Sequence, residues 1–476
     1  MSCDHIYGKV SGEMINFSDL NFIFRFLPVF IIAFYLTPSR FRTWTLLLGS
    51  IVFYAVGDLR MLPALLGAVF VNFLFARAQA GEKSKSLFIF ILLIDAGMLT
   101  EFKILGQYVD NRLLPVGISF YIFKMISYQV DVYRDRIRNN AAFKDVAAYF
   151  CMFPQLVSGP IMRFQDYDRN RMIDGSEDKA GQALGRKNLN GILLAIEDGL
   201  LYFVAGLAMK VLLADHLAML WKEIGTIGYE SISTPLAWLG AVTYSLELYF
   251  DFWGYSLMAA GVGIMLGFPF VLNFDHPYGS GSVAEFYRRW HVTLGTWFRD
   301  YIYIPLGGSR KGGGRTFLNL LVVWLVTGFW HGVSLNFILW GLVLFLIIAL
   351  EKFLVFKYLP KWLAKVIGRF NVLILIPLTW VIFAIPDSFM LRDYFERLFP
   401  LFGQGIAVND ADFIKKLSVY WPVLVPGLIL LIPGVFRFWE NNRRRIVFTV
   451  AWFFLFWACV FSLSNAAGNP FMYFRF

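Results

Sequence analysis

The chain is a series of apolar stretches, most of them close to the length needed to cross a lipid bilayer, separated by short polar turns. The stretches lie at 20–36, 43–57, 61–76, 86–100, 112–130, 190–213, 233–273, 316–330, 333–354, 370–386, 417–436 and 446–463. A helix of about 20 mostly apolar residues spans the hydrocarbon core. The stretch at 233–273 is long enough for two such helices, and we expect two there. We therefore predict an all-α polytopic membrane protein with about 11 or more transmembrane or re-entrant helices.

The composition supports this prediction and excludes other classes of protein. Hydrophobic residues make up 58% of the chain and charged residues 16%, whereas roughly a quarter of an ordinary soluble domain is charged. The formal net charge is +10, but the lysines and arginines gather in the short turns, where membrane topology already explains them. We therefore expect neither a soluble enzyme nor a nucleic-acid-binding protein.

The basic turns predict the orientation of the chain in the membrane. Basic residues lie at 40–42, 77–85 and 134–138, after the first, third and fifth apolar stretches, and at 443–445, before the last stretch. Because basic turns stay in the cytoplasm, both termini are expected outside. The prediction is one integral-membrane domain over 1–476, with an outward tail at 1–19 and an outward aromatic segment at 471–476.

One segment of the second half is too charged to face lipid and too aromatic for a simple loop. It runs from Glu285 to Pro305 and includes Trp290 and His291. Such a segment persists at membrane depth only where protein or water covers it, so it predicts a functional site. An interfacial helix that arginine and tryptophan anchor at the headgroups is the alternative.

A second ionisable position follows an apolar run. His331 comes directly after the apolar stretch at 320–326, which places it inside the hydrocarbon region. A neutral imidazole suits a general base that activates a hydroxyl for acyl transfer. His291 is its candidate partner, and a structural role is the alternative for either histidine. Neither has a second histidine or a carboxylate at ligand spacing, so we predict no metal.

Two further patterns bear on the chemistry. No Gly-x-Ser-x-Gly sequence is present, and none of the three cysteines lies in a polar segment with a histidine. An acyl-enzyme on serine or cysteine therefore lacks support, and direct transfer from a thioester fits better. The glycine-rich basic turn at 307–315 could meet the phosphates of a nucleotide-like carrier, although a cytoplasmic loop explains it equally well.

Eight short motifs follow one another along the chain. They are LPVGISFY at 114–121, SYQVDVY at 127–133, FPQLVSGP at 153–160, YFDFWGY at 249–255, RWHVTL at 289–294, WFRDYIYIPLGG at 297–308, GFWHG at 328–332 and NFILWG at 336–341. In this order they resemble the membrane-bound O-acyltransferase family, and most of all its alginate O-acetyltransferase branch. The likeness covers nearly the whole chain.

The resemblance implies helices around a central cavity that has a cytoplasmic and an extracellular funnel. His331 matches the family's catalytic histidine, and His291 matches a second position that is structural or orients the donor. The remaining positions assigned to the cavity and substrate are Trp290, Trp297, Arg299, Asp300, Trp330 and Asn336. The implied donor is cytoplasmic acetyl-CoA, and the implied acceptor is an extracellular or periplasmic polysaccharide.

The sequence does not identify the acceptor polymer. Members of the alginate branch commonly carry Ser and Asp in the region of Trp253 and Leu257, and both positions are bulky and apolar here. Related proteins transfer D-alanine to teichoic acid or acetyl groups to peptidoglycan and cellulose-like polymers. A second hypothesis is therefore D-alanyl transfer from an acyl carrier protein. A third, non-enzymatic hypothesis is a transporter of a lipid-linked sugar with both histidines in a proton relay.

The C-terminal segment FMYFRF at 471–476 resembles an aromatic motif found in relatives and in small companion peptides of the D-alanylation machinery. Tyr473 is therefore a candidate acyl carrier, because a phenolic hydroxyl outside the membrane could take an acyl group and pass it on. An aromatic membrane anchor is the alternative. The resemblance also implies an extracytoplasmic SGNH-like, esterase-like partner protein and a bacterial plasma (inner) membrane.

Overall fold

The computed structural model describes residues 16–81, 83–137, 141–171, 189–400, 409 and 411–465. Within these ranges the chain forms helices, turns and loops, and no strand. The predicted outward segment at 471–476, with Tyr473, lies outside the described residues, as does most of the predicted tail at 1–19.

The helices follow one another through short connections. The first half contains α1 (Leu27–Leu36), α2 (Arg42–Asp58), α3 (Leu62–Gly81), α4 (Lys85–Tyr108), α5 (Ile118–Tyr133), α6 (Phe143–Cys151), α7 (Phe153–Leu156) and α8 (Phe164–Arg171). The middle contains α9 (Leu189–Ala208), α10 (Asp215–Ile227), α11 (Thr234–Met265), α12 (Val283–Arg289), α13 (Val292–Phe298), α14 (Gly313–His331) and α15 (Leu335–Leu350). The last part contains α16 (Phe356–Tyr358), α17 (Lys361–Phe370), α18 (Ile376–Ala384), α19 (Ser388–Leu398), α20 (Asp412–Leu430), α21 (Pro433–Asn442) and α22 (Ile446–Asn465).

In the described part of the chain, seven helical stretches are long and apolar enough to cross a membrane. They are Ser39–Gly81, Asn111–Tyr133, Leu189–Ile227, Leu335–Tyr358, Lys361–Ala384, Asp412–Leu430 and Ile446–Asn465. The last of these leaves large apolar side chains such as Ile446 and Phe461 exposed, which is how a helix that faces lipid looks without its bilayer. The prediction of an all-helical, multi-pass membrane protein is confirmed.

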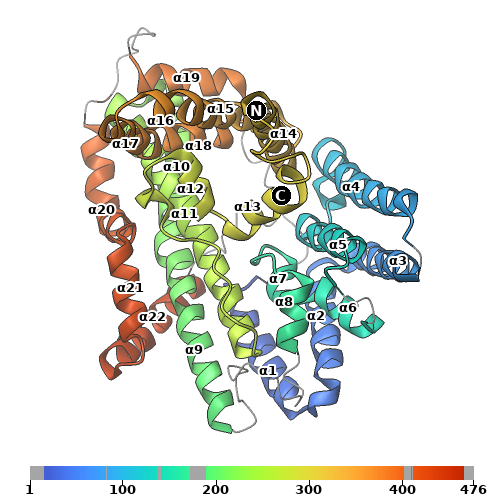
Figure 1. The fold of residues 1–476 in the computed structure, drawn as a ribbon. Coiled ribbons are helices and arrows are strands. Elements are labelled where there is room, and N and C mark those ends of the chain that lie inside the picture. The colour runs from blue at the N-terminus through green and yellow to red at the C-terminus, as the bar shows by residue number, and fades with distance from the viewer. Residues whose placement is uncertain are drawn as a thin grey trace.

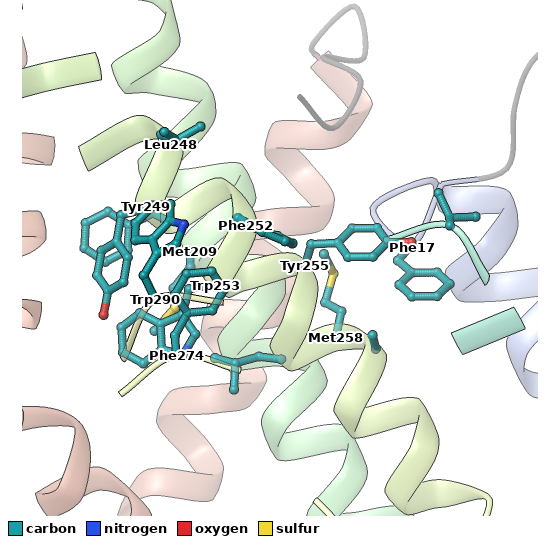
Figure 2. Packing of buried hydrophobic residues seen from close by; sticks show 14 of the residues in the cluster. Phe17, Met209, Leu248, Tyr249, Phe252, Trp253, Tyr255, Met258, Phe274 and Trp290 are labelled. Carbon is teal, nitrogen blue, oxygen red and sulfur yellow. The ribbon is translucent and has the colours of Figure 1, made fainter. Parts of the chain in front are cut away.

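Helices α9 and α11 lie side by side at the centre of the molecule (Figure 1). A Cβ atom on Gly206 would lie 2.3 Å from the carbonyl oxygen of Gly254, and one on Gly199 would lie 2.5 Å from that of Gly261. Only glycine permits backbones to approach this closely, and small residues commonly occupy such contacts between membrane helices. The core continues along α11, where Tyr255 stacks on Phe17 with ring centroids 5.0 Å apart (Figure 2).

The prediction of two helices between 233 and 273 is wrong. The structure has a single helix there, α11, of 32 residues. Its only proline is at the first turn, where a helix tolerates it, so nothing interrupts the helix before Leu266. The short helices α12 and α13 follow it, and α13 lies between α11 and α5 (Figure 1). They carry most of the predicted polar, aromatic segment into the middle of the fold.

Candidate active site

The polar segment begins in α12, and side chains at or just before its start cap this helix. The Ser282 hydroxyl accepts a hydrogen bond from the backbone N–H of Glu285 at 3.0 Å, and the Glu285 carboxylate accepts one from the N–H of Gly281 at 2.9 Å. This pattern closely follows the capping box, in which serine and glutamate satisfy backbone donors at a helix start. The Gly281 N–H and the Arg289 guanidinium hold the pKa of Glu285 below its ordinary value. The helix therefore starts at a fixed point, which positions the residues at its end.

His291 stands at the sharp turn between α12 and α13. Its backbone is left-handed, with φ of 46°, a conformation that few residues other than glycine adopt and that often marks functional sites. The side chain is 4% exposed. The Nδ1 atom lies 3.0 Å from Oδ1 of Asn273, and the Asn273 amide donates to the Ser256 hydroxyl at 2.9 Å.

These contacts determine the protonation state that His291 favours. Because Oδ1 of Asn273 is an acceptor, the imidazole carries its hydrogen on Nδ1 and its lone pair on Nε2. Nε2 is buried and has no hydrogen-bond partner among the described residues. A buried, unpaired ring nitrogen is rare in proteins and can accept a proton from a bound molecule.

Trp290 anchors the same turn from the other side. Its ring lies 5.1 Å from those of Phe274 and Trp380, by centroids, and 5.9 Å from that of Tyr249. Figure 2 shows Trp290 among Tyr249, Trp253 and Phe274. These contacts bury Trp290 in the aromatic core, so its position is set by packing.

His331 is the last residue of α14 and is 8% exposed. Aromatic rings surround it, with centroid distances of 4.4 Å to Trp330, 5.0 Å to Trp340 and 5.0 Å to Phe383. Such rings exclude water and hold the imidazole in one orientation. His331 also interacts electrostatically with His291. The fold thus brings together the two predicted histidines, one in the turn before α13 and the other at the end of α14.

Close packing of α14 against α15 fixes the position of His331. A Cβ atom on Gly328 would lie 2.5 Å from the Phe337 carbonyl oxygen, and one on Gly341 would lie 2.5 Å from that of Trp324. The buried Asn336 donates to the carbonyl of Phe383 at 2.8 Å and accepts from Ser334 at 2.5 Å. Asn336 therefore ties the loop after His331 to α18.

Trp297 and Trp330 both pack on one residue of α5. Their ring centroids lie 4.3 Å and 5.7 Å from that of Phe123, and the Trp297 indole N–H donates to the Phe123 carbonyl at 2.9 Å. The indole N–H of Trp330 is buried without a partner in the described part of the chain. These two tryptophans join α13, α14 and α5 beside the histidines.

Arg299 and Asp300 lie on a π-helical turn, η9 (Arg299–Tyr303), and form a charged cluster with Arg163. Asp300 accepts from Arg299 at 2.7 Å and pairs with Arg163. Burial raises the pKa of the Asp300 carboxyl, but the hydrogen bonds and charges of the two arginines outweigh it, so the pKa is below its ordinary value. The Arg299 side chain is 59% exposed, whereas those of Arg163 and Asp300 are mostly buried, so Arg299 is the part of the cluster that faces outward.

Sequence reasoning missed several residues of this region. Asn273, which orients His291, lies in an irregular loop without a motif. Lys103 of α4 is buried and donates to the carbonyl of Trp330, next to His331. Its only signal in the sequence is a lysine between Phe102 and Ile104 in a mostly apolar helix.

Three other sequence predictions have their place here. Trp253 and Leu257, the two bulky positions singled out in the sequence, are both buried. Trp253 packs on Phe436 at 4.8 Å and on His276 at 5.5 Å, by centroids. Within the described ranges, no group of three or more His, Cys, Asp or Glu residues is placed to hold a metal ion. Tyr473 lies outside those ranges.

Comparison with known proteins identifies the family. The chain matches the membrane-bound O-acyltransferase family over residues 38–391. It is 36% identical to a probable alginate O-acetylase of Azotobacter vinelandii, over 97% of this chain and 100% of the relative. It is 33% identical to the peptidoglycan O-acetyltransferase of Helicobacter pylori, over 67% of each chain. It is 30% identical to the teichoic acid D-alanyltransferase of Lacticaseibacillus rhamnosus, over 59% of this chain and 71% of that one. The chain is therefore an O-acyltransferase and belongs to the membrane-bound O-acyltransferase family.

Proposed function

We propose that this protein transfers an acetyl group from acetyl-CoA in the cytoplasm to a hydroxyl on the outer side of the membrane, for O-acetylation of a polysaccharide. The observation that carries the proposal is the buried pair of His331, at the end of α14, and His291, in the turn before α13. Aromatic rings pack against both imidazoles. The relatives named as alginate and peptidoglycan acetyltransferases support the choice of acetyl group and acceptor class.

The proposed reaction uses His331 as general base. Its imidazole takes the proton of the acceptor hydroxyl while the hydroxyl oxygen bonds to the acetyl carbonyl carbon. The carbon–sulfur bond then breaks, and the departing thiolate takes the proton back from the imidazolium, which leaves CoA thiol and neutral His331. The lone pair on Nε2 of His291 would orient the acceptor hydroxyl or the donor. Holding both reactants in a water-poor site supplies an entropic advantage.

The donor side is proposed to be the face that carries Arg163, Arg299 and the basic turn at 307–315. An arginine with an exposed guanidinium suits the phosphates of CoA. The ion pair between Lys83 and Asp135 joins two turns predicted to be cytoplasmic. Helix α14 starts in the basic turn at 307–315 and is 19 residues long, so His331 lies roughly 27 Å along the helix from its start. This length is close to the thickness of the hydrocarbon core, so the acetyl group would be transferred near the outer side of the membrane.

The finer features of the proposal follow from the family likeness. Eleven or so membrane-spanning or re-entrant helices would enclose a cavity with a cytoplasmic and an outer funnel, in a bacterial inner membrane with both termini outside. The cavity positions would be Trp290, Trp297, Arg299, Asp300, Trp330 and Asn336. Tyr473 would accept the acetyl group as a phenyl ester and pass it to an SGNH-like partner outside.

The test uses purified protein in lipid nanodiscs with isotopically labelled acetyl-CoA, and it measures CoA release and label on the protein. His331→Gln is expected to lower the rate of thioester cleavage roughly a hundredfold or more. His216→Gln on α10 is the matched control, because in the described residues the hydrogen-bond partner of the His216 ring is the nearby backbone carbonyl of Val211. Label on Tyr473 that disappears in His331→Gln would support the relay. Full activity of His331→Gln would refute the assignment of the base.

D-alanyl transfer is the second candidate, and the likeness to a teichoic acid D-alanyltransferase favours it. The same nanodisc assay distinguishes the two donors. If a D-alanyl-charged carrier protein supports His331-dependent transfer while acetyl-CoA does not, the site is the same and the acyl group is different. The carrier would then contact the basic cytoplasmic face.

A further inference from the structure

Helix α4 holds the chain on both sides of His331. The Lys103 ammonium donates to the carbonyl oxygen of Trp330, and the Gln107 Oε1 atom accepts from the backbone N–H of Val333 at 3.0 Å. Lys103 and Gln107 are four residues apart and therefore share one face of α4. His331 thus lies between two peptide groups that are hydrogen-bonded to the same face of α4.

Lys103 brings an uncompensated positive charge to this position. The side chain is 5% exposed, and its ammonium lies 5.8 Å from the ring centroid of Trp330. No carboxylate of the described residues forms an ion pair with it. Burial lowers the pKa of the Lys103 amine to about 7, so an anion beside it would favour the charged form. A buried cation without a counter-ion is costly, and the carbonyl at the end of α14 and the indole face offset only part of that cost.

The Lys103 ammonium also has N–H donors that the Trp330 carbonyl does not use. A lysine ammonium has three N–H donors, and the Trp330 carbonyl uses one. The neutral Gln107 shows that an uncharged side chain suffices to grip this loop. A charge at Lys103 therefore needs a reason beyond holding the backbone, and an anion that forms beside His331 would supply the missing counter-charge.

We propose that Lys103 stabilises the oxyanion of the acyl-transfer reaction, an inference that rests on the proposed function. When the hydroxyl oxygen bonds to the acyl carbon, the carbonyl π electrons move to oxygen and form an alkoxide. Lys103 donates a hydrogen bond to that alkoxide and keeps its own proton throughout. Collapse of the alkoxide restores the carbonyl and breaks the carbon–sulfur bond. A preorganised charge in a water-poor site acts strongly at this step.

The experiment compares Lys103→Met with Gln107→Met in nanodiscs. Both changes give the same unbranched apolar side chain and each removes one hydrogen bond to the loop around His331, but only the first removes a charge. The readouts are kcat and KM for acetyl-CoA from CoA release, with the melting temperature as the measure of folding. Loss of one oxyanion donor lowers kcat by roughly a hundredfold to a thousandfold.

We expect Lys103→Met to show this roughly hundredfold to thousandfold loss of kcat with KM unchanged, and Gln107→Met to show a much smaller loss. Lys103→Arg should recover part of the activity, because it keeps the charge in another shape. Equal losses in the two methionine variants would overturn the inference and leave Lys103 a structural cap. If Lys103→Met does not fold, Lys103→Gln decides, because it retains a donor without the charge, and wild-type kcat in that variant would refute the proposal.

The outcomes separate this inference from the proposed function. A wild-type protein whose activity requires His331, together with a fully active Lys103→Met variant, overturns only the role of Lys103. A wild-type protein that cleaves no acyl thioester, or an active His331→Gln variant, overturns both.

Discussion

Asn273 fixes the imidazole of His291 by a contact of 3.0 Å between Oδ1 and Nδ1. The same oxygen accepts from the Thr293 hydroxyl at 2.9 Å, so a single amide oxygen organises the turn at the start of α13. Because this contact holds the hydrogen on Nδ1, it leaves the lone pair of Nε2 available to a substrate.

Replacing Asn273 with Leu should therefore impair activity more than folding. A lost buried hydrogen bond is worth about 1–3 kcal/mol, which corresponds to roughly a tenfold to hundredfold loss of kcat if it falls on the reacting conformation. Ser256→Ala is the control, because it removes only the acceptor of the Asn273 amide. CoA release and the melting temperature are measured for both. Unchanged kcat in Asn273→Leu would show that the orientation of His291 does not matter.

Gly328→Ala should destabilise the protein and displace His331. The new Cβ atom would lie 2.5 Å from the Phe337 carbonyl oxygen, so α14 and α15 must move apart. Overpacking of this kind costs about 1–3 kcal/mol. Gly314→Ala, in the same helix, meets nothing within 4 Å and should be neutral or slightly stabilising, since alanine favours helix. Melting temperatures in nanodiscs test this, and equal values for the two variants would contradict it.

The sequence allowed prediction of the fold class, and it drew attention to the two histidines, because an ionisable residue in an apolar stretch is conspicuous without any structure. It did not reveal their partners. Lys103 donates to a carbonyl 227 residues away, and the contact exists only once α4 packs against the end of α14. Asn273 is one polar residue among several in a loop, and only the left-handed turn at His291 brings it to the imidazole. The undivided length of α11 also escaped prediction, because hydropathy limits a helix by bilayer thickness, whereas α11 is enclosed by protein.

Arg299→Gln should weaken binding of the donor without affecting the chemical step. The Arg299 guanidinium is exposed, and among the described residues its one ion pair is to the neighbouring Asp300, so it can turn to a phosphate. We expect KM for acetyl-CoA to rise roughly tenfold at low salt, with kcat unchanged, and the difference to shrink as salt screens the charge. Arg392→Gln on α19 removes another exposed arginine from an ion pair, here with Glu396, and should leave KM unaltered. A salt-independent KM would count against phosphate binding at Arg299.

Asp300 should make the stability of the charged cluster depend on pH in the acidic range. The two arginines hold the pKa of its carboxyl below the ordinary value, so the folded state favours the ionised form more than the unfolded state does. The resulting stabilisation is fully present above the ordinary carboxyl pKa of about 4, and it is lost as the pH falls through the lower folded value. Asp300→Asn should therefore lower stability near neutral pH by about 1 kcal/mol after solvent screening. The difference in melting temperature between wild type and Asp300→Asn should narrow below about pH 4. Asp393→Asn is the control, because Asp393 is a partly exposed carboxylate on α19, outside this cluster. A difference that grows as the pH falls would mean that Asp300 is stabilised in its protonated form, and the ion pairs with Arg163 and Arg299 would then not account for its role.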